Sequence, residues 1–387
     1  MTPGFSRLSV RGYRRLRNVD LSLRPLNVLI GANGIGKSSV LDVFRLLAGS
    51  ANGRLAATVA DLGSFPFLLT ADGTTNAVTI EARSRESGTL QNDYHLELRQ
   101  AGNSYVILRE YLRRMSDLAA ALLSTPPKSI DSEGSRIRYA IDGKYVEPDW
   151  DYKWSETSLS QTPRNSHDAE RFRQALADIS GVYHGLDVSG RSPVRMPQTL
   201  TPIQVPNVNG EDLVSCLFTM RETARDRFEA VEDALRAAFP SMERLEFPPV
   251  AAGHLTLGWR EHGFARPFYA NELSEGTLRF LWLTTLLQSP GLPQVTLIDE
   301  PEVSLHPEML RLLADLMREA SERTQLIVAT HSDRFVRFLD PKELLVCDRD
   351  ETGGMTTRWA DELDIKEWME DYTLDQLWSK GIIGGRS

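Results

Sequence analysis

The octapeptide Gly31-Ala-Asn-Gly-Ile-Gly-Lys-Ser38 decides the fold class of this chain. It matches the pattern G-x-x-x-x-G-K-[ST], in which glycine-rich backbone wraps a phosphate group and a helix begins near the lysine. The apolar run Asn27–Ile30 before it is typical of a strand buried on both faces, and Ser38–Ala48 after it has apolar residues at helical spacing. The sequence therefore predicts a strand, a phosphate-binding loop and a helix; the alternative is a glycine-rich turn that binds nothing.

The residue types in this loop suit a nucleoside triphosphate with its metal ion. Lys37 supplies a mobile positive charge for the β- and γ-phosphates, and Ser38 supplies a hydroxyl ligand for Mg²⁺. The loop and the first helical turn supply converging N–H groups. We therefore expect ATP and Mg²⁺ as ligands, contacted by Asn33, Gly34, Ile35, Gly36, Lys37, Ser38 and Ser39.

Two adjacent acids provide the partner that a phosphate loop needs. Asp299 and Glu300 directly follow the apolar run Val295–Ile298, so they would lie where a buried strand ends. Ligands of open α/β sheets bind at that edge. We expect Asp299 to orient the magnesium shell and Glu300 to polarise the attacking water as a general base. Strand ends often carry solvated acids, so the acidic pair indicates a nucleotide site only in combination with the phosphate loop.

The remaining patterns predict an α/β fold. Buried strands separated by amphipathic helices in the last third of the chain are typical of a parallel sheet. Alternating runs near the N-terminus predict an antiparallel sheet. The expected parallel strands are Asn27–Ile30, Val295–Ile298, Leu326–Ala329 and Leu344–Cys347; the helices between them are Pro307–Glu319 and Phe335–Leu339; the antiparallel strands are Leu8–Arg11, Val19–Leu23, Val78–Ala82 and Tyr94–Leu98.

We expect three regions along the chain. Residues 1–110 form an N-terminal lobe with the phosphate loop and the antiparallel sheet, 111–207 an inserted α/β region, and 208–387 a C-terminal lobe with a helical part. Loop signals between 111 and 175 suggest the insertion. One long helix is predicted over Glu211–Phe239, either as one face of a core helix or as a coiled-coil seam.

Composition excludes several classes of protein. The chain has 387 residues, of which 41% are hydrophobic, and its longest apolar runs are far short of a membrane helix. Its two cysteines exclude a disulfide framework and a cysteine-rich zinc site. No secretory signal is visible, so we expect a cytoplasmic protein without a membrane partner. A net charge of −9 argues against a uniformly basic nucleic-acid binder, while leaving room for a local basic patch.

Four motifs in order resemble those of ABC-type ATPases, in the form found in RecF- and SMC-like head domains and in stand-alone bacterial AAA/ABC-type ATPases. The loop with Asn33 is similar to theirs, and Leu273–Thr277 resembles their signature. The segment Asp299–Pro307 resembles their second acidic motif with its D-loop, and Thr330–Ser332 resembles their switch histidine. The resemblance implies a P-loop NTPase of ABC type with a mostly parallel core sheet flanked by helices.

The resemblance also implies a homodimer that forms on ATP binding. In such heads the signature helix of one copy closes on the γ-phosphate held by the other, which assigns this contact to Ser274 and Gly276. His331 would sense the γ-phosphate; the alternative is a polar residue after a strand. The signature departs from L-S-G-G-Q at Glu275, an acid that we expect to point away from a triphosphate. The coupling glutamine of the family is not obvious, and Gln198 and Gln204 are candidates.

The partner of the expected switch is less defined. Five arginines near the first strands predict either a DNA contact or a strand edge protected by charge: Arg7, Arg11, Arg14, Arg15 and Arg17. We expect an ATP-hydrolysing switch that acts in DNA repair or phage defence through DNA, a nuclease or another effector protein. The alternatives are the ATP-binding subunit of a membrane transporter and a nucleotide-binding scaffold with little hydrolysis.

Overall fold

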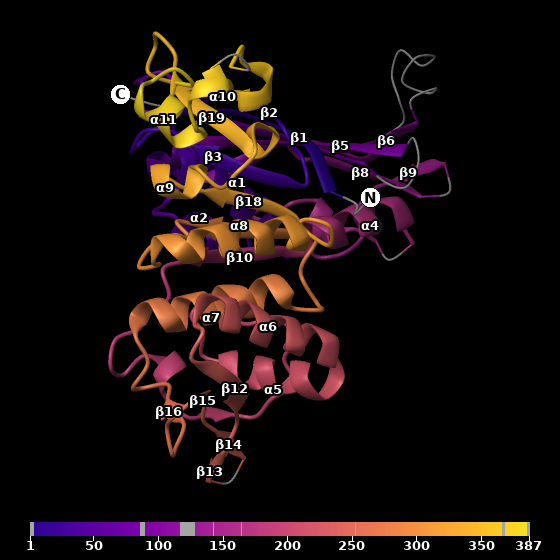
Figure 1. The fold of residues 1–387 in the computed structure, drawn as a ribbon. Helices are drawn as coiled ribbons and strands as arrows, with labels where there is room; N and C mark the ends of the chain where they lie inside the picture. Colours follow the sequence, from indigo (N-terminus) through magenta and orange to yellow (C-terminus); the bar gives the residue numbers. More distant parts are fainter. Residues whose placement is uncertain are drawn as a thin grey trace.

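The computed structural model describes residues 4–85, 90–116, 128–141, 143–163, 165–251, 253–365 and 368–384. Two large sheets dominate them, with helices between and beside the sheets (Figure 1). A mixed α/β fold was predicted, and the α/β class is confirmed. In the described part of the chain, no helix has the length and apolar character needed to cross a membrane.

The six-stranded sheet carries the predicted strands of the last third of the chain. Its order is β10-β17-β18-β3-β19-β20, and all neighbours pair in parallel except β19 and β20. The phosphate loop follows β3 at the centre of this sheet. The strands are β10 (Ile179–His184), β17 (Val295–Asp299), β18 (Gln325–Ala329), β3 (Leu26–Ile30), β19 (Leu344–Arg349) and β20 (Met355–Trp359).

The central strands are buried on both faces because each face has its own cover. Val28 and Ile30 of β3 belong to one hydrophobic core, and Leu29 between them belongs to the other. The first core contains residues of α5 to α9, and the second contains α1, α2, α4 and the antiparallel sheet. The covering helices are α1 (Lys37–Ala51), α2 (Leu55–Asp61), α4 (His167–Ala177), α7 (Glu275–Gln288), α8 (Pro307–Ala320) and α9 (Asp333–Val336).

The eight-stranded sheet is antiparallel between all its neighbours, in the order β2-β1-β4-β5-β6-β7-β8-β9. The region boundary expected at residue 110 falls inside β6, and β7 to β9 extend the sheet beyond it. The first strands of the expected insertion are thus part of this sheet. The strands are β1 (Gly4–Tyr13), β2 (Leu16–Ser22), β4 (Ala77–Arg85), β5 (Leu90–Ala101), β6 (Ser104–Ser116), β7 (Lys128–Glu133), β8 (Arg136–Ile141) and β9 (Lys144–Val146).

The prediction of one helix over Glu211–Phe239 is wrong, because the structure has two helices there. They are α5 (Leu213–Thr223) and α6 (Arg225–Ala238), separated at Ala224, where φ is −144° and ψ is 62°. Both helices contribute buried residues to the first core, so the core-face reading holds. The apolar spacing continues across the break, which is why the pattern read as a single helix.

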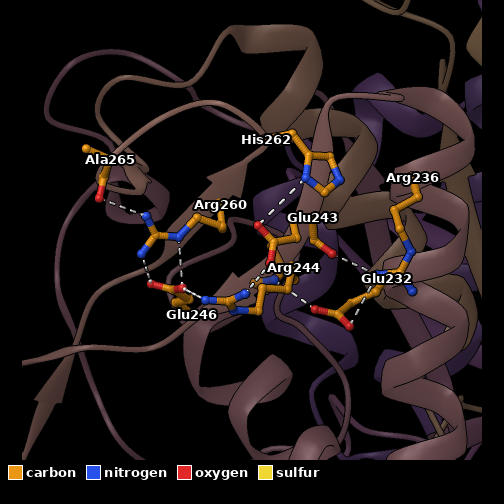
Figure 2. A network of polar contacts seen from close by, with 9 residues as sticks. Glu232, Arg236, Glu243, Arg244, Glu246, Arg260, His262 and Ala265 are labelled. Atoms are coloured by element: carbon orange, nitrogen blue, oxygen red, sulfur yellow. Dashed lines mark hydrogen bonds and ion pairs between the residues drawn. The ribbon is translucent and has the colours of Figure 1, made fainter.

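Helices α5 to α7 and two small sheets form one end of the molecule, and α10 (Trp368–Asp371) and α11 (Leu374–Ser379) lie at the opposite end (Figure 1). Figure 2 shows how the small sheet of β12 and β15 is tied to α6 by charged side chains: Arg236 donates to the carbonyl of Glu243 (2.9 Å), and Glu232 accepts from the N–H of Leu245 (2.8 Å). The short strands are β11 (Gln198–Thr199), β12 (Met242–Glu246), β13 (Pro249–Ala251), β14 (His254–Leu255), β15 (Gly258–Glu261) and β16 (Phe268–Tyr269).

One side chain joins the two large sheets. The amide of Gln325, at the start of β18, accepts from the N–H of Phe5 (2.9 Å) and donates to its carbonyl (2.8 Å). It also donates to the carbonyl of Arg24 (2.9 Å). The side chain thus pairs with β1 as a neighbouring strand backbone would.

Candidate nucleotide-binding site

The polar residues that follow three neighbouring parallel strands meet in one cavity. The loop after β3, the acids at the end of β17 and the histidine after β18 share the carboxyl edge of the sheet, because the order of these strands is β17-β18-β3. The cavity is lined by Arg14, Arg15, Asn33, Gly34, Gly36, Lys37, Ser38, Ser39, Asp299, Glu300 and His331.

Glycine is required in the loop for two separate reasons. Gly31, Gly34 and Gly36 have φ values of 155°, 69° and 124°, which L side chains rarely adopt. At Gly31 there is also no space, since a Cβ atom would lie 2.4 Å from the carbonyl oxygen of Cys347 in β19. The backbone therefore turns sharply at the strand end and enters α1 at Lys37.

The start of α1 presents N–H groups to the cavity that have no acceptor inside the helix. Val40 donates to the carbonyl of Gly36 (3.2 Å), so the N–H groups of Lys37, Ser38 and Ser39 precede the first bond of the helix. The ammonium of Lys37 donates to the carbonyls of Gly31 (2.6 Å) and Ala32 (3.1 Å). Lys37 is only 8% exposed, and its burial lowers the pKa of the ammonium. These groups suit an anion.

Ser38 and Asp299 face each other from opposite sides of the cavity. The hydroxyl of Ser38 donates to Oδ2 of Asp299 over 3.3 Å. Burial raises the pKa of the Asp299 carboxyl, and the electrostatic influence of nearby His184 acts in the opposite direction. Within the described residues, no group of three or more His, Cys, Asp or Glu side chains could hold a metal. A hydroxyl and one carboxylate nevertheless fit Mg²⁺, which commonly takes one or two protein oxygens and completes its shell with water and phosphate.

Glu300 and His331 form a second pair beside the first. His331 Nδ1 lies 3.1 Å from Oε1 of Glu300. Glu300 has a left-handed backbone (φ 51°), and its N–H donates to the carbonyl of Ala329 in β18 (2.8 Å). A left-handed residue other than glycine costs free energy, so the neighbouring structure must hold Glu300 in place. The conformation turns its carboxylate towards the histidine.

Three predicted site residues lie outside this cavity. The side chain of Ile35 is buried in the core, and its N–H donates to the carbonyl of Ala32 (3.4 Å). Ser274 and Gly276 do not line the cavity and lie at the start of α7. The hydroxyl of Ser274 accepts from the N–H of Thr277 (3.1 Å), which makes Ser274 the N-cap. The roles of Ser274 and Gly276 at a nucleotide stay predictions.

The acid that departs from the family signature is held in place. Oε1 of Glu275 accepts from the hydroxyl of Ser304 (2.7 Å) and from Nε of Arg279 (3.1 Å). Ser304 is left-handed (φ 63°), and its carbonyl oxygen would lie 2.7 Å from a Cβ atom at Gly276. The loop that follows the acidic pair thus packs directly against the start of α7.

The structure adds residues that sequence reasoning assigned elsewhere or left without a role. Arg14 and Arg15 line the cavity, although they were considered only for DNA or a strand edge. His184 ends β10 opposite Asp299, and its Nδ1 lies 3.4 Å from Oδ2 of that acid. The spacing of apolar residues in the sequence did not predict strand β10. The parallel register is what places His184 there.

Other residues singled out in the sequence are engaged elsewhere in the chain. Arg7 pairs with Asp20 (2.6 Å) and Arg14 with Asp42 (2.6 Å), so part of the arginine cluster is engaged within the chain. Gln198 is buried and bonds to backbone groups of Pro193, Gly210 and Val214; neither it nor Gln204 lines the cavity. His306 caps α8, with its Nδ1 accepting from the N–H of Glu308 (3.5 Å).

Comparisons with known proteins identify a family and a fold for the chain. Residues 26–337 match the AAA_21 family, described as "AAA domain, putative AbiEii toxin, Type IV TA system". No curated protein matches the chain. An SMC head bound to the C-terminal winged-helix domain of ScpA is similar in structure, with a TM-score of 0.57, 13% identity and coverage of 92% of this chain and 98% of that one. An SMC head with an extended coiled coil, bound to the C-terminal domain of ScpA from Pyrococcus furiosus, gives 0.50, 14%, 95% and 98%.

The family match spans most of the chain, so this protein belongs to the AAA_21 family. Its fold is that of SMC head domains. The prediction of a stand-alone AAA-type ATPase with an SMC-like head is thereby confirmed at the level of family and fold.

Proposed function

We propose that this chain is an ATP-hydrolysing switch of the RecF/SMC-like ABC class that dimerises on ATP. One observation carries the proposal: the loop lysine, the Ser38–Asp299 pair and the Glu300–His331 pair line a single cavity. Anion-binding, metal-binding and proton-accepting groups are thus combined at one sheet edge.

Each group has a distinct task in the proposed reaction. Lys37 exchanges its loop carbonyls for phosphate oxygens, and the first N–H groups of α1 bind the same anion. Ser38 and Asp299 would hold Mg²⁺, which supplies charge neutralisation on the phosphates. Glu300 orients the attacking water and accepts its proton, while His331 contacts the terminal phosphate.

The proposed dimer would complete the site with α7 of a second copy. The capped start of α7 carries the positive end of the helix dipole, which favours a phosphate group. Glu275 would weaken this contact if its carboxylate were free, but Ser304 and Arg279 hold it. Two-fold symmetry would give two equivalent nucleotide sites.

The proposed output of the switch rests on the descriptions of similar proteins. The description of the matched family is "AAA domain, putative AbiEii toxin, Type IV TA system", and the similar SMC heads are bound to ScpA domains. We propose an effector protein or DNA as the partner, in DNA repair or phage defence. Arg11 and Arg15 are exposed and would be candidates to contact DNA phosphates, although Arg11 donates to Oδ1 of Asn18 (3.2 Å) and Arg15 also lines the nucleotide cavity.

The test is a comparison of wild type with Glu300→Gln. Wild type should release phosphate from ATP, and Glu300→Gln should bind ATP, release phosphate at least about 10²-fold more slowly and accumulate as a dimer. Phosphate release and light scattering with and without ATP measure the two properties. A wild type without phosphate release would leave a nucleotide-binding scaffold, and a Glu300→Gln protein that stays monomeric with bound ATP would contradict the dimer.

A further inference from the structure

Glu302 is a buried acid that the proposed hydrolysis does not use. It lies in the loop between β17 and α8, two residues beyond Glu300. Its Oε1 accepts from the hydroxyl of Thr330 (2.5 Å), and its Oε2 is buried with no hydrogen-bond partner within the described residues. Burial raises the pKa of Glu302. A buried acid with one unpaired oxygen costs stability, so its presence needs an explanation.

Thr330 connects Glu302 to the histidine loop. It is fully buried directly after β18, and its N–H donates to the carbonyl of Leu29 (3.0 Å). Its hydroxyl donates to Glu302 and also accepts from the N–H of Ser332 (3.1 Å). One hydroxyl thus fixes the residues on both sides of His331. Valine, with the same shape, could make neither bond.

The far side of the histidine loop is anchored as well. The hydroxyl of Ser332 accepts from the N–H of Phe335 (3.3 Å) and caps α9. His331 therefore projects from a three-residue loop held at each end, with its Nδ1 3.1 Å from Glu300. A small shift of this loop would separate the imidazole from the carboxylate, because such contacts weaken steeply with distance and angle.

We propose that Glu302 is a positioning residue that holds His331 beside Glu300 through the hydroxyl of Thr330. The inference rests on the proposed hydrolysis for its consequence, but the placement of His331 can be tested without nucleotide. Only the acceptor atom Oε1 is required, so glutamine should replace Glu302 and alanine should not. Likewise Thr330→Ser keeps the hydroxyl, and Thr330→Val removes it.

The first experiment observes the imidazole directly, in full-length protein labelled with ¹³C-histidine and without nucleotide. The His331 signal is assigned by its loss in His331→Ala. It should shift in Glu302→Ala and Thr330→Val, and keep its position in Glu302→Gln and Thr330→Ser. Glu343→Ala is the matched control, since Glu343 is also buried but pairs with Arg318 just before β19, at the opposite edge of the sheet. It should leave the signal unchanged.

The second experiment separates binding from turnover. Glu302→Ala should bind a fluorescent ATP analogue within about twofold of wild type and lose phosphate release on the order of 10²-fold, as His331→Ala does. The double variant Glu302→Ala/His331→Ala should release phosphate no more slowly than His331→Ala alone, because both substitutions act through one imidazole.

Three results would overturn the inference: an unmoved His331 signal in both Glu302→Ala and Thr330→Val, additive losses in the double variant, or a Glu302→Gln protein as impaired as Glu302→Ala. Thr330→Val carries the test if Glu302→Ala fails to fold. A wild type that hydrolyses no ATP would contradict the proposed function, while the histidine signal would still decide where Glu302 holds His331.

Discussion

The nucleotide cavity and the small β12–β15 sheet are both rich in charge, yet they are built in opposite ways. At the cavity Lys37 is buried against backbone carbonyls and Glu300 is left-handed; in the loop just beyond it Ser304 is left-handed and Glu302 has a buried oxygen without a partner in the described chain. In the small sheet, Glu246 contacts both Arg244 (2.8 Å) and Arg260 (3.1 Å), and these side chains are partly exposed (Figure 2).

The two regions should respond differently to a single substitution. Contacts in the small sheet are duplicated and solvated, so water or a second arginine can replace a lost partner. At the cavity Lys37 and Asp299 are more deeply buried, and the left-handed backbone at Glu300 is held only by its surroundings. We therefore expect large effects at the cavity and small ones in the network of Figure 2, and the following predictions test this contrast in order of expected size.

The largest effect is expected for Lys37→Ala. Removal of the ammonium should weaken ATP binding at least about 10²-fold, because charge-assisted bonds to phosphates are the strong ones. The free energy of unfolding should change little, since a buried amine with a lowered pKa contributes little to the fold. Equilibrium titration with a fluorescent ATP analogue measures the affinity, with Arg244→Ala as the control. If Lys37→Ala bound ATP with wild-type affinity, the expected difference between the cavity and the small sheet would be contradicted.

Gly31→Ala should be the most damaging to stability. Its Cβ atom would meet the carbonyl oxygen of Cys347 at 2.4 Å, in a backbone conformation unsuited to alanine. We expect a loss of about 2–4 kcal/mol in the free energy of unfolding. Gly134→Ala is the matched control, with φ 57° but nothing within 4 Å of the added atom. Urea unfolding compares the two, and equal losses would show that the close approach is unimportant.

Gly276→Ala should have a smaller effect of unexpected sign. Alanine is about 1 kcal/mol better than glycine inside a helix, so the helix alone would gain. The added Cβ atom would, however, lie 2.7 Å from the carbonyl oxygen of Ser304. We expect a net loss of about 1–2 kcal/mol in thermal or urea unfolding. A more stable Gly276→Ala protein would mean that the loop at Ser304 yields easily.

The smallest effect is expected for Arg244→Ala. The side chain is half exposed, and Glu246 keeps Arg260 as a partner. The free energy of unfolding should fall by about 0.2–1 kcal/mol, with unchanged ATP binding. Urea unfolding at low and high salt measures it, because screening should shrink the difference. A loss above about 2 kcal/mol would mean that this network is as sensitive to a single substitution as the cavity.

Sequence reasoning succeeded where the signal is local. The predicted cavity residues lie at the end of a short buried strand, as Asp299 does, or in the segment that follows one, as the loop to Lys37 does, so a pattern of a few residues placed them at a sheet edge. The family and its fold followed from the order of such patterns, and the comparisons agree. What these residues do to ATP stays a prediction.

Sequence reasoning failed where position depends on distant segments. In β10 only Ile179 and Tyr183 are buried and a histidine stands at the end, and the parallel pairing with β17 brings His184 beside Asp299. Arg15 reaches the cavity because the β1–β2 hairpin passes over Gly36. The break at Ala224 is hidden because the apolar residues keep their spacing across it. No short window of sequence contains these facts.

The central position of β3 has a consequence for synthesis of the protein. Its two neighbours in the sheet, β18 and β19, are encoded near the other end of the chain. A ribosome therefore releases the phosphate loop long before the strands that fix it, and pairing over such separations is slow. The growing polypeptide must therefore keep an apolar strand from wrong partners until β18 and β19 have been made, and an unpaired apolar strand is prone to aggregate during that interval.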